Sequence, residues 1–503
     1  MILPEWTISD LQERMESGEL TARRLVELYT ERISEIDKNG PYINSVIELN
    51  PDASEIADGL DAERRAGKTR GLLHGIPILI KDNIDTADRM QTTAGSLALE
   101  GHMAAKDAFI VKQLRKAGAL ILGKTNLSEW ANFRGKRSVS GWSSRGGLTR
   151  NPYALDRTAS GSSSGSGAAV AANLCAAAVG TETDGSIISP SQTNGIVGIK
   201  PTLGLLSRSG IIPIAHSQDT PGPMARTVTD AAILLSAMLG ADGRDPATRG
   251  SRKRGVANLT KLLDRDGLRE ARIGVVRNMA GTNPRILKLL EHCIEVLKHL
   301  GAVVVDPADV PNFDKFEKSE LEVLFYEFKA DLNKYLGSVN GTVHIRTLED
   351  VIEFNEENSH RVMPYFGQEL MITAQEKKSL RDKKYRDALA RNLRLTRKEG
   401  IDAAIRNHKL DALIVPSGGP ARLIDLVNGD ASNWDGESTS PAAVAGYPHI
   451  TVPAGLIFGL PVGISFFGQA WQEPALIRFA YAFEQATQFR RQPRFLPTAN
   501  LNP

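Results

Sequence analysis

The sequence predicts an α/β fold, in which a large core sheet is covered by helices. Short apolar runs, closed by glycine and polar residues, are typical of buried strands. Segments with apolar residues at helical spacing lie between these runs, in the alternating order of α/β proteins. The chain has 503 residues, of which 41% are hydrophobic and 24% charged, so it can bury a sizeable core.

The first predicted elements are two short helices. Residues 7–34 place apolar side chains at helical spacing, with Thr7 and Ser9 as candidate caps, and Gly18 interrupts the pattern. We therefore expect one helix before this glycine and one after it.

A strand, a helix and a second strand follow. Residues 75–80 and 119–122 are compact apolar runs, which indicates two buried strands. Residues 107–117 alternate apolar and basic side chains with a period near 3.6, which predicts a helix between them. The order is that of a βαβ unit.

The middle of the chain contains a serine-rich run followed by an apolar segment. Residues 151–160 contain proline, charges and turn formers, which predicts a loop. Residues 168–178 are hydrophobic around the whole helical circumference, which predicts a helix inside the protein. The polar stretch 240–260 lacks periodicity, and we expect an excursion there that ends the first half.

The second half resumes the α/β pattern. Residues 313–408 have a mostly helical pattern, acidic early and basic later, which is typical of solvated helix faces. We expect strands at 272–276, 302–305, 411–416, 449–453 and 461–468, and helices at 284–300 and 473–490.

Composition disfavours several classes of protein. The 61 basic and 59 acidic side chains give a net charge of +2, so no global field attracts nucleic acid or an anionic membrane. No apolar run reaches the ~18 residues of a membrane span. Cys175 and Cys293 give no disulfide framework, and we expect both to be buried apolar side chains.

The N-terminus carries little information about the compartment. It has no basic segment followed by an apolar one, so no export signal is visible. We expect a soluble protein, cytoplasmic as written, or exported if a leader has been removed.

Two motif matches lack the flanking structure that their chemistry needs. Residues 118–125 satisfy G-x-x-x-x-G-K-[ST], but the inner residues are strand-like, so their amides would bond within a sheet rather than to phosphate. Residues 161–165 satisfy the G-x-S-x-G nucleophile elbow, but a loop at 151–160 replaces the required strand. Nothing singles out His216 or His449 as the base of a histidine triad.

Lys81 is a better candidate for a general base. It follows the predicted strand at 75–80, so its side chain emerges at the carboxyl end, where α/β sheets place their sites. Burial would lower the pKa of its ammonium group and leave a neutral amine. The alternative is a lysine that caps the strand end and pairs with Asp82 or Asp85.

Several segments together resemble the amidase signature family. They are GIPILIKDNI around Lys81, GKTNLSEW at 123–130, the Gly/Ser run from 160, TETDGSI around Ser186, GIVGIKPT at 195–202, SQDTPGPMAR at 217–226, and LDALIVPS and AGYPHITVPAG near the C-terminus. The resemblance covers about residues 7–491. Within the family, NLSEWANFRG, SGWSSRGGLTRNPY, GSSSGSG and TETDGS are most similar to bacterial peptide amidases, which hydrolyse C-terminal peptide amides.

The resemblance implies a Ser-cisSer-Lys triad. By local motif, Ser186 matches the nucleophile, Ser162 the bridging serine after a cis peptide bond, and Lys81 the general base. The backbone amides that match the oxyanion hole are those of Thr183, Asp184, Gly185 and Ser186.

Other residues around this triad have expected roles. Asn132, Phe133 and Arg134 follow GKTN and would line the acyl pocket. Asp184 stands where many family members have glycine, and its carboxylate would disfavour an oxyanion unless it points away. The remaining serines of the cluster are expected to be turn and helix-cap groups.

Three functions follow from these observations. The first is an amidohydrolase, without metal or organic cofactor, that releases ammonia from a small-molecule or peptide amide, foremost the C-terminal amide of peptides. The second is the glutamine-hydrolysing subunit of a tRNA-dependent amidotransferase. The third is a non-catalytic binding protein on the same fold, which the presence of Lys81, Ser162 and Ser186 disfavours.

The resemblance also implies an architecture. We expect one amidase-signature domain over residues 1–503, with a mixed, twisted sheet covered by helices on both faces and a signature core at about 60–235. The helical block at 313–408 is expected to cover the site and to help set substrate access. We expect a monomer or homodimer, without nucleic-acid or membrane partners.

Overall fold

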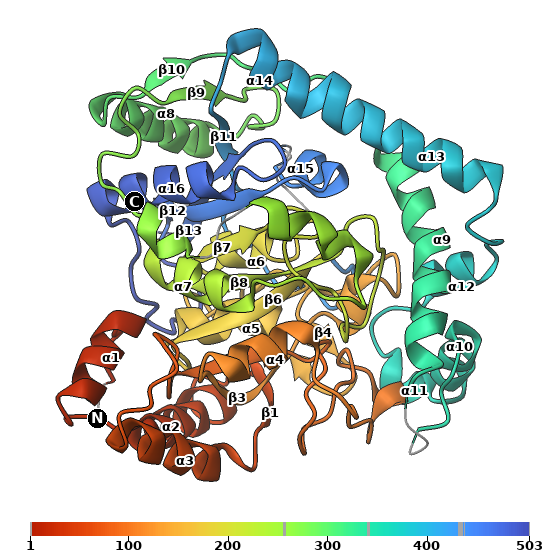
Figure 1. Cartoon of the computed structure of the whole chain (residues 1–503). Coiled ribbons are helices and arrows are strands. Elements are labelled where there is room, and N and C mark those ends of the chain that lie inside the picture. Colours follow the sequence, from red (N-terminus) through yellow and green to blue (C-terminus); the bar gives the residue numbers. More distant parts are fainter. Residues whose placement is uncertain (1–2, 255–257, 340–342, 431–435, 437, 502–503) are drawn as a thin grey trace.

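An eleven-stranded mixed sheet forms the centre of the molecule (Figure 1). The computed structural model describes residues 3–254, 258–339, 343–430, 436 and 438–501. The strands of this sheet are β1 (Val46–Leu49), β2 (Pro77–Lys81), β3 (Leu120–Thr125), β6 (Ala177–Glu182), β7 (Val197–Lys200), β8 (Thr220–Ala225), β9 (Arg272–Val275), β10 (Val303–Val305), β11 (Ala412–Pro416), β12 (His449–Ile457) and β13 (Leu460–Phe467). Their spatial order is β1-β3-β2-β6-β8-β7-β12-β13-β11-β9-β10. A separate small sheet joins β4 (Trp142–Ser143) and β5 (Gly147–Leu148).

Parallel and antiparallel pairs share the large sheet. β2 is parallel to β3 and β6, whereas β6 is antiparallel to β8. The helices that cover it are α1 (Ile8–Glu16), α2 (Ala22–Arg32), α3 (Ala53–Arg65), α4 (Phe109–Lys116), α5 (Ser164–Ala171), α6 (Ile188–Thr193), α7 (Val228–Met238), α8 (Pro284–His299), α15 (Ser440–Ala445) and α16 (Glu473–Thr487). The predicted fold class, a mixed sheet covered by helices, is confirmed.

The predicted N-terminal helices are present as α1 and α2. The Thr7 hydroxyl accepts a hydrogen bond from the Asp10 amide at 3.1 Å, and the Asp10 carboxylate accepts one from the Thr7 amide at 2.9 Å. This reciprocal capping box starts α1. Gly18 has a φ of +79° and lies between the two helices.

The helix predicted at 168–178 is wrong in its second half. α5 is followed by Asn173 in the left-handed region, with a φ of +58°, and the chain then continues into β6. A helix that is apolar on every side and a strand buried on both faces have the same composition, so periodicity could not separate them. Pairing with β2 and β8 decides the structure.

Strand β8 was not predicted because it contains two prolines. Proline lacks the N–H donor of a ladder bond and usually argues against a central strand. Pro221 and Pro223 stand at alternate positions, so both missing donors face the same side of the strand. Neighbouring β7 pairs only with Met224 and Ala225, beyond both prolines.

The region predicted to be mostly helical, 313–408, lies along one side of the molecule (Figure 1). Its longest helix is α9, whose Phe325 and Phe328 pack against Phe133 of the core, with ring centroids 5.6 and 5.0 Å apart. The block contains α9 (Glu317–Leu336), α10 (Leu348–Glu357), α11 (Ser359–Val362), α12 (Glu369–Gln375), α13 (Lys383–Leu393) and α14 (Asp402–His408). An apolar cluster therefore fixes α9 to the core.

Candidate active site

Lys81 is the last residue of β2 and is completely buried. Its Nζ donates to Ser162 Oγ at 2.7 Å, to Thr181 Oγ1 at 2.9 Å and to Ser163 Oγ at 3.1 Å. It also lies 3.2 Å from the carbonyl oxygen of Thr181. The lysine therefore faces hydroxyl groups rather than Asp82 or Asp85, the ion partners of the alternative interpretation.

Burial sets the protonation of Lys81. Removal from water lowers the pKa of its ammonium group to about 7, although the charges of Asp219 and Glu182 oppose the shift. A large fraction of the side chain is therefore a neutral amine near neutral pH. A neutral amine beside a hydroxyl can act as a general base.

Ser162 follows a cis peptide bond, as the resemblance implied, and its side chain is buried. Its carbonyl oxygen accepts a hydrogen bond from the Ser128 amide at 3.1 Å. A Cβ atom on the preceding Gly161 would lie 2.2 Å from Ser128 Oγ. A larger residue at that position would force the Ser128 side chain to move, which favours glycine where the serine cluster is interrupted.

Ser186 lies in the loop between β6 and α6, and its carbonyl oxygen accepts from the Ser163 amide at 3.2 Å. This bond joins the loop of the predicted nucleophile to the segment of the predicted bridging serine. Among the described residues, no hydrogen bond links the hydroxyls of Ser162 and Ser186. The structure thus brings Lys81 and Ser162 into direct contact and places Ser186 beside them through its backbone.

The residues before Ser186 form the predicted oxyanion loop, residues 183–186. The backbone amides of Thr183 and Ser186 donate to no acceptor in the described part of the chain. Gly185 has a φ of +74°, a conformation that favours glycine. The Asp184 carboxylate accepts a hydrogen bond from the Ser440 hydroxyl at 2.5 Å, at the start of α15.

Asn132 and Phe133 lie in a strained segment between the core and α9. Trp130, Ala131 and Asn132 all have positive φ values, of 53°, 53° and 73°. The Phe133 ring packs against α9, as described above. Of this segment, Ala131 lines the cavity that Thr181 also lines, whereas Asn132 and Phe133 are not among its lining residues. Arg134 is buried and forms an ion pair with Glu129 at 2.9 Å.

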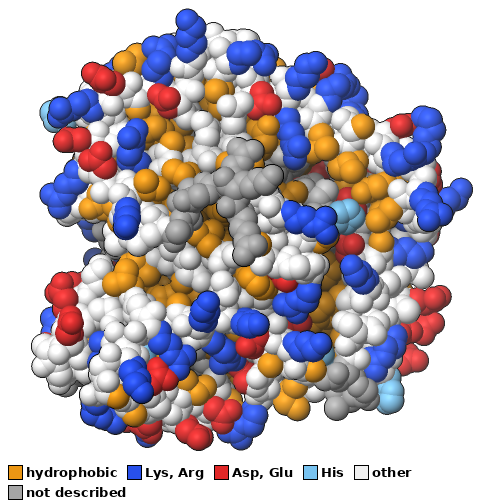
Figure 2. Space-filling model, viewed as in Figure 1, with side chains coloured by type: hydrophobic (Ala, Val, Ile, Leu, Met, Phe, Trp, Pro, Cys, Tyr) orange, Lys and Arg blue, Asp and Glu red, His pale blue; other side chains and the backbone are white. Residues whose placement is uncertain are grey.

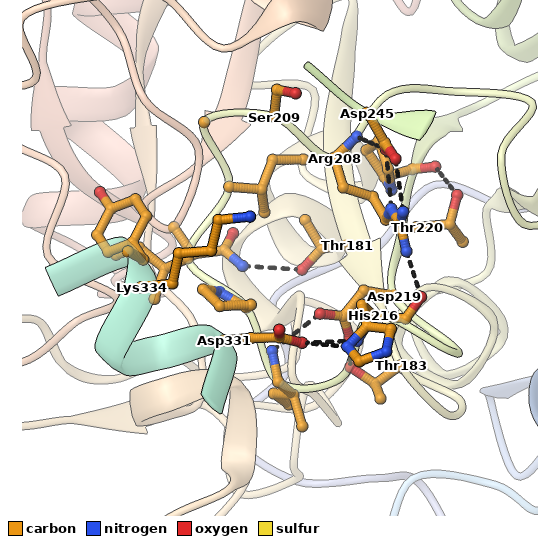
Figure 3. Close-up of a pocket in the computed structure, with 18 of the residues that line it drawn as sticks. Thr181, Thr183, Arg208, Ser209, His216, Asp219, Thr220, Asp245, Asp331 and Lys334 are labelled. Carbon is orange, nitrogen blue, oxygen red and sulfur yellow. Dashed lines mark hydrogen bonds and ion pairs between the residues drawn. The ribbon is translucent and has the colours of Figure 1, made fainter. Parts of the chain in front are cut away.

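A cavity of about 670 Å³ lies next to Thr181, a hydroxyl partner of Lys81 (Figure 3). Thr181, the hydroxyl partner of Lys81, lines it, and so do Asn83 and Thr183. The opposite wall includes Asp331 and Lys334 of α9. The cavity therefore lies between the catalytic candidates and the helical block.

Charged groups in this cavity are mostly paired with one another. Arg208 forms an ion pair with Asp245, and the His216 Nδ1 atom lies 2.7 Å from Asp331 (Figure 3). Burial lowers the pKa of His216, but the hydrogen bond to Asp331 and the charge of Glu327 outweigh it, so the pKa is raised.

His216, Glu327 and Asp331 are the group of described residues with the spacing of metal ligands. A metal ion would need a deprotonated imidazole and free carboxylate oxygens. In the structure, the raised pKa of His216 favours the protonated ring, and Glu327 accepts hydrogen bonds from Tyr385 and Ser217. The arrangement fits an ion pair between the core and α9 better than a metal site.

The two motif matches set aside earlier are accounted for. Lys124 of the phosphate-loop match lies on β3, and its buried Nζ donates to the Ile84 carbonyl at 2.7 Å and to Thr92 Oγ1 at 2.9 Å. The elbow match is preceded by a loop, not a strand. His449 is buried, and the pKa of its ring is lowered to about 3 by burial, so it is no base for the serines.

Several residues of the site carried no signal in the sequence that would single them out. Thr181 belongs to TETDGSI but has no position that marks it as a partner of Lys81. Asn83 donates to Thr181 Oγ1 at 3.0 Å, and Asp219 accepts from the Thr183 hydroxyl at 2.6 Å. These contacts join residues that are far apart in the sequence, and they form only when particular strands pair in the sheet.

Similarity to known proteins defines the class of this chain. The profile of the Amidase family matches residues 24–477, so the chain belongs to the amidase signature family and is an amide-hydrolysing enzyme. The predicted resemblance is confirmed.

Particular relatives lie within this family. The native peptide amidase from Stenotrophomonas maltophilia is 51% identical, with a TM-score of 0.93 over 97% of this chain and 98% of that chain. A probable amidase of Arabidopsis thaliana is 42% identical over 98% of this chain and 92% of its own length. A glutamyl-tRNA(Gln) amidotransferase subunit from Symbiobacterium thermophilum is 33% identical over 94% of this chain and 95% of its own length.

The surface agrees with the balanced composition. On the face shown in Figure 2, basic and acidic side chains are interspersed. None of the helices in the described ranges combines the length and apolar character that a membrane span requires.

Proposed function

We propose that this enzyme hydrolyses the C-terminal amide of peptides through an acyl-enzyme on Ser186. The relation to peptide amidase supports this substrate, because that enzyme shares 51% of its residues with this chain. The cavity of about 670 Å³ also supports it, because a peptidyl acyl group needs room whereas the leaving ammonia does not.

In the proposed mechanism, protons move along Ser186, Ser162 and Lys81. Neutral Lys81 takes the proton of Ser162 as Ser162 takes that of Ser186, and Ser186 Oγ bonds to the amide carbon. This relay requires the two serine hydroxyls to meet, in a hydrogen bond that forms when substrate binds. Lys81 then gives its proton back to Ser162 as Ser162 passes one proton to the amide nitrogen, the C–N bond breaks and ammonia leaves.

Water completes the cycle by attacking the ester on Ser186, with the same lysine as base. The carboxylate product leaves and the Ser186 hydroxyl is restored. In both halves, backbone amides of the 183–186 loop hold the negative oxygen, and those of Thr183 and Ser186 have no other acceptor among the described residues. The Asp184 carboxylate is compatible with this role, since it is engaged by Ser440.

The observation that carries the proposal is the contact between Lys81 and Ser162. An amine with a pKa lowered to about 7 lies 2.7 Å from the hydroxyl that follows the cis peptide bond. A lysine that only caps the strand end would instead be expected to pair with Asp82 or Asp85, and in the described ranges no such ion pair links it to them.

We also propose that residues 1–503 form one domain, in which the helical block 313–408 covers the site. The support is that α9 supplies a wall of the cavity and packs on the core through Phe133. Limited proteolysis that releases the block as a separately folded fragment would contradict this proposal.

Ammonia release from the purified chain tests the function. We expect turnover of an amidated peptide and none by Ser186→Ala. Turnover of glutamine, only with added partner proteins, would instead favour the glutamine-hydrolysing role in an amidotransferase, since the chain is 33% identical to one such amidotransferase component. Absence of fluorophosphonate labelling at Ser186, together with binding of an amide but no turnover, would indicate a binding protein.

A further inference from the structure

Thr183, the first residue of the oxyanion loop, is held by two consecutive residues of another segment. Its hydroxyl donates to Asp219 Oδ1 at 2.6 Å, and its carbonyl oxygen accepts from Gln218 Nε2 at 3.2 Å. Its own backbone amide is left without an acceptor among the described residues. The side chain and the carbonyl group of Thr183 are therefore fixed by hydrogen bonds, while its backbone amide can still donate to an oxyanion.

Asp219 lines the cavity, but its carboxylate is already occupied. Besides the Thr183 hydroxyl on Oδ1, its Oδ2 accepts from the amides of Ile214 and Ala215, each at 2.9 Å. Ile214 is itself a residue of the cavity wall. A carboxylate with three donors is poorly suited to bind a substrate group, and well suited to tie the wall to Thr183.

Gln218 fixes the direction of a peptide plane. In a trans peptide, the carbonyl and the following N–H point in opposite directions. Since the Thr183 carbonyl points at Gln218, the Asp184 N–H is directed away from it. This bond therefore orients part of the predicted oxyanion loop.

The same segment contacts α9. Gln218 Nε2 also donates to Glu320 Oε1 at 2.9 Å, and the Ser217 amide donates to Glu327 Oε2 at 2.8 Å. The His216 ring lies against Asp331 on the same helix (Figure 3). Residues 216–219 thus connect the helical block to the loop that precedes Ser186.

We propose that Gln218 and Asp219 are positioning residues, which hold the 183–186 loop in the geometry that binds the oxyanion and link that loop to α9. This inference rests on the proposed role of the loop in amide hydrolysis. Neither side chain touches the reacting atoms. Their effect is therefore expected on the chemical step rather than on substrate binding.

The test compares two variants with matched controls. Asp219→Asn and Gln218→Leu remove the two bonds to Thr183. Asp37→Asn is the control for the first, since Asp37 also accepts from one hydroxyl and two amides, those of Ser45 and Val46. Gln113→Leu is the control for the second, since Gln113 Nε2 donates to the Leu239 carbonyl at 2.8 Å, outside the site.

Two readouts separate positioning from stability. We expect Asp219→Asn and Gln218→Leu to lower kcat by roughly ten- to a hundredfold, which does not exceed the fall in kcat caused by removing one oxyanion donor. The KM should stay within about threefold of the wild-type value. The rate of fluorophosphonate labelling at Ser186 should fall in parallel, which needs no knowledge of the natural substrate. The controls should lower the melting temperature at most, with kcat within about twofold.

The outcomes are distinct. If the wild-type chain is active and the two variants lose no more kcat or labelling rate than their controls, or only raise KM, the positioning role is overturned. If the wild type neither releases ammonia from amides nor is labelled at Ser186, the proposed function fails, and this inference fails with it. Should Asp219→Asn not fold, Thr183→Val removes the same bond at nearly constant volume and takes its place.

Discussion

Two buried lysines, Lys81 and Lys200, end strands of the same sheet and lie near the same carboxylate. Lys81 is the last residue of β2 and Lys200 the last of β7. Burial lowers the pKa of Lys81 to about 7 and that of Lys200 to about 8, and in both cases the charge of Glu182 opposes the shift. By pKa alone, either amine could be a base.

The difference lies in what each ammonium group contacts. Lys81 faces three hydroxyl groups, whereas the hydrogen bond of Lys200 goes to the Pro201 carbonyl at 3.1 Å. A carbonyl has no proton to give, so Lys200 cannot activate a nucleophile. A lowered pKa identifies a base only where a hydroxyl lies within reach.

The largest expected effect is loss of the base itself. Lys81→Met should lower kcat/KM for an amidated peptide by a factor on the order of 10² to 10⁴, since it removes general-base catalysis. Lys200→Met should change the same quantity by less than about tenfold. Ammonia release measures both, and a greater loss in Lys200→Met would reverse the roles given to the two lysines.

The next largest effect is expected in the pH dependence of kcat/KM, which should follow the protonation of Lys81. Lys81 must be neutral to accept a proton, and its pKa is lowered to about 7, so activity is lost as pH falls through that value. On the acid side, kcat/KM should rise about tenfold per pH unit and then level off above the pKa. A profile of kcat/KM that stays flat between about pH 5.5 and 8 would contradict a lysine base.

Sequence reasoning could predict the candidate site at the positions that local motifs determine. Ser162 follows Gly161, where a Cβ atom would lie 2.2 Å from Ser128 Oγ, and Lys81 ends an apolar strand. Asp219 could not be singled out, because it stands 36 residues after Thr183 and meets it only once β8 pairs with β6. Similarly, the fold class followed from alternating patterns, whereas the proline-containing β8 needed its partners to become a strand.

A smaller effect is expected from the hydroxyl that Lys81 shares with Asn83. Thr181 Oγ1 accepts from Lys81 at 2.9 Å and from Asn83 at 3.0 Å. Thr181→Val removes an acceptor that favours the charged ammonium, so the pKa of Lys81 should fall further. We expect the acid limb of kcat/KM to move to lower pH, with kcat reduced roughly three- to tenfold because the amine is less well held. An unchanged acid limb would show that Thr181 does not act on Lys81.

The smallest effect on activity, and a clear one on stability, is expected for Lys200. Burial raises the pKa of Glu182, and the charge of Lys200 opposes this shift, so Lys200→Met should raise that pKa further. A carboxyl whose folded pKa lies above its unfolded value binds more protons when folded, so its contribution to stability falls as pH rises. Lys200→Met also removes the free-energy cost of burying a charged ammonium group. This gain is almost the same at about pH 5 and pH 7, since both pH values lie below the Lys200 pKa of about 8.

The melting temperature of Lys200→Met, relative to the wild type, should therefore drop more at about pH 7 than at about pH 5, with kcat within a few fold. Thermal unfolding at the two pH values measures this difference. Lys81→Met is the matched comparison, because Glu182 is only its second neighbouring charge, after Asp219. An equal change in melting temperature at both pH values would mean that Lys200 does not compensate Glu182. The contrast between a lysine that acts on a hydroxyl and a lysine that neutralises a carboxylate would then have to rest on hydrogen bonding alone.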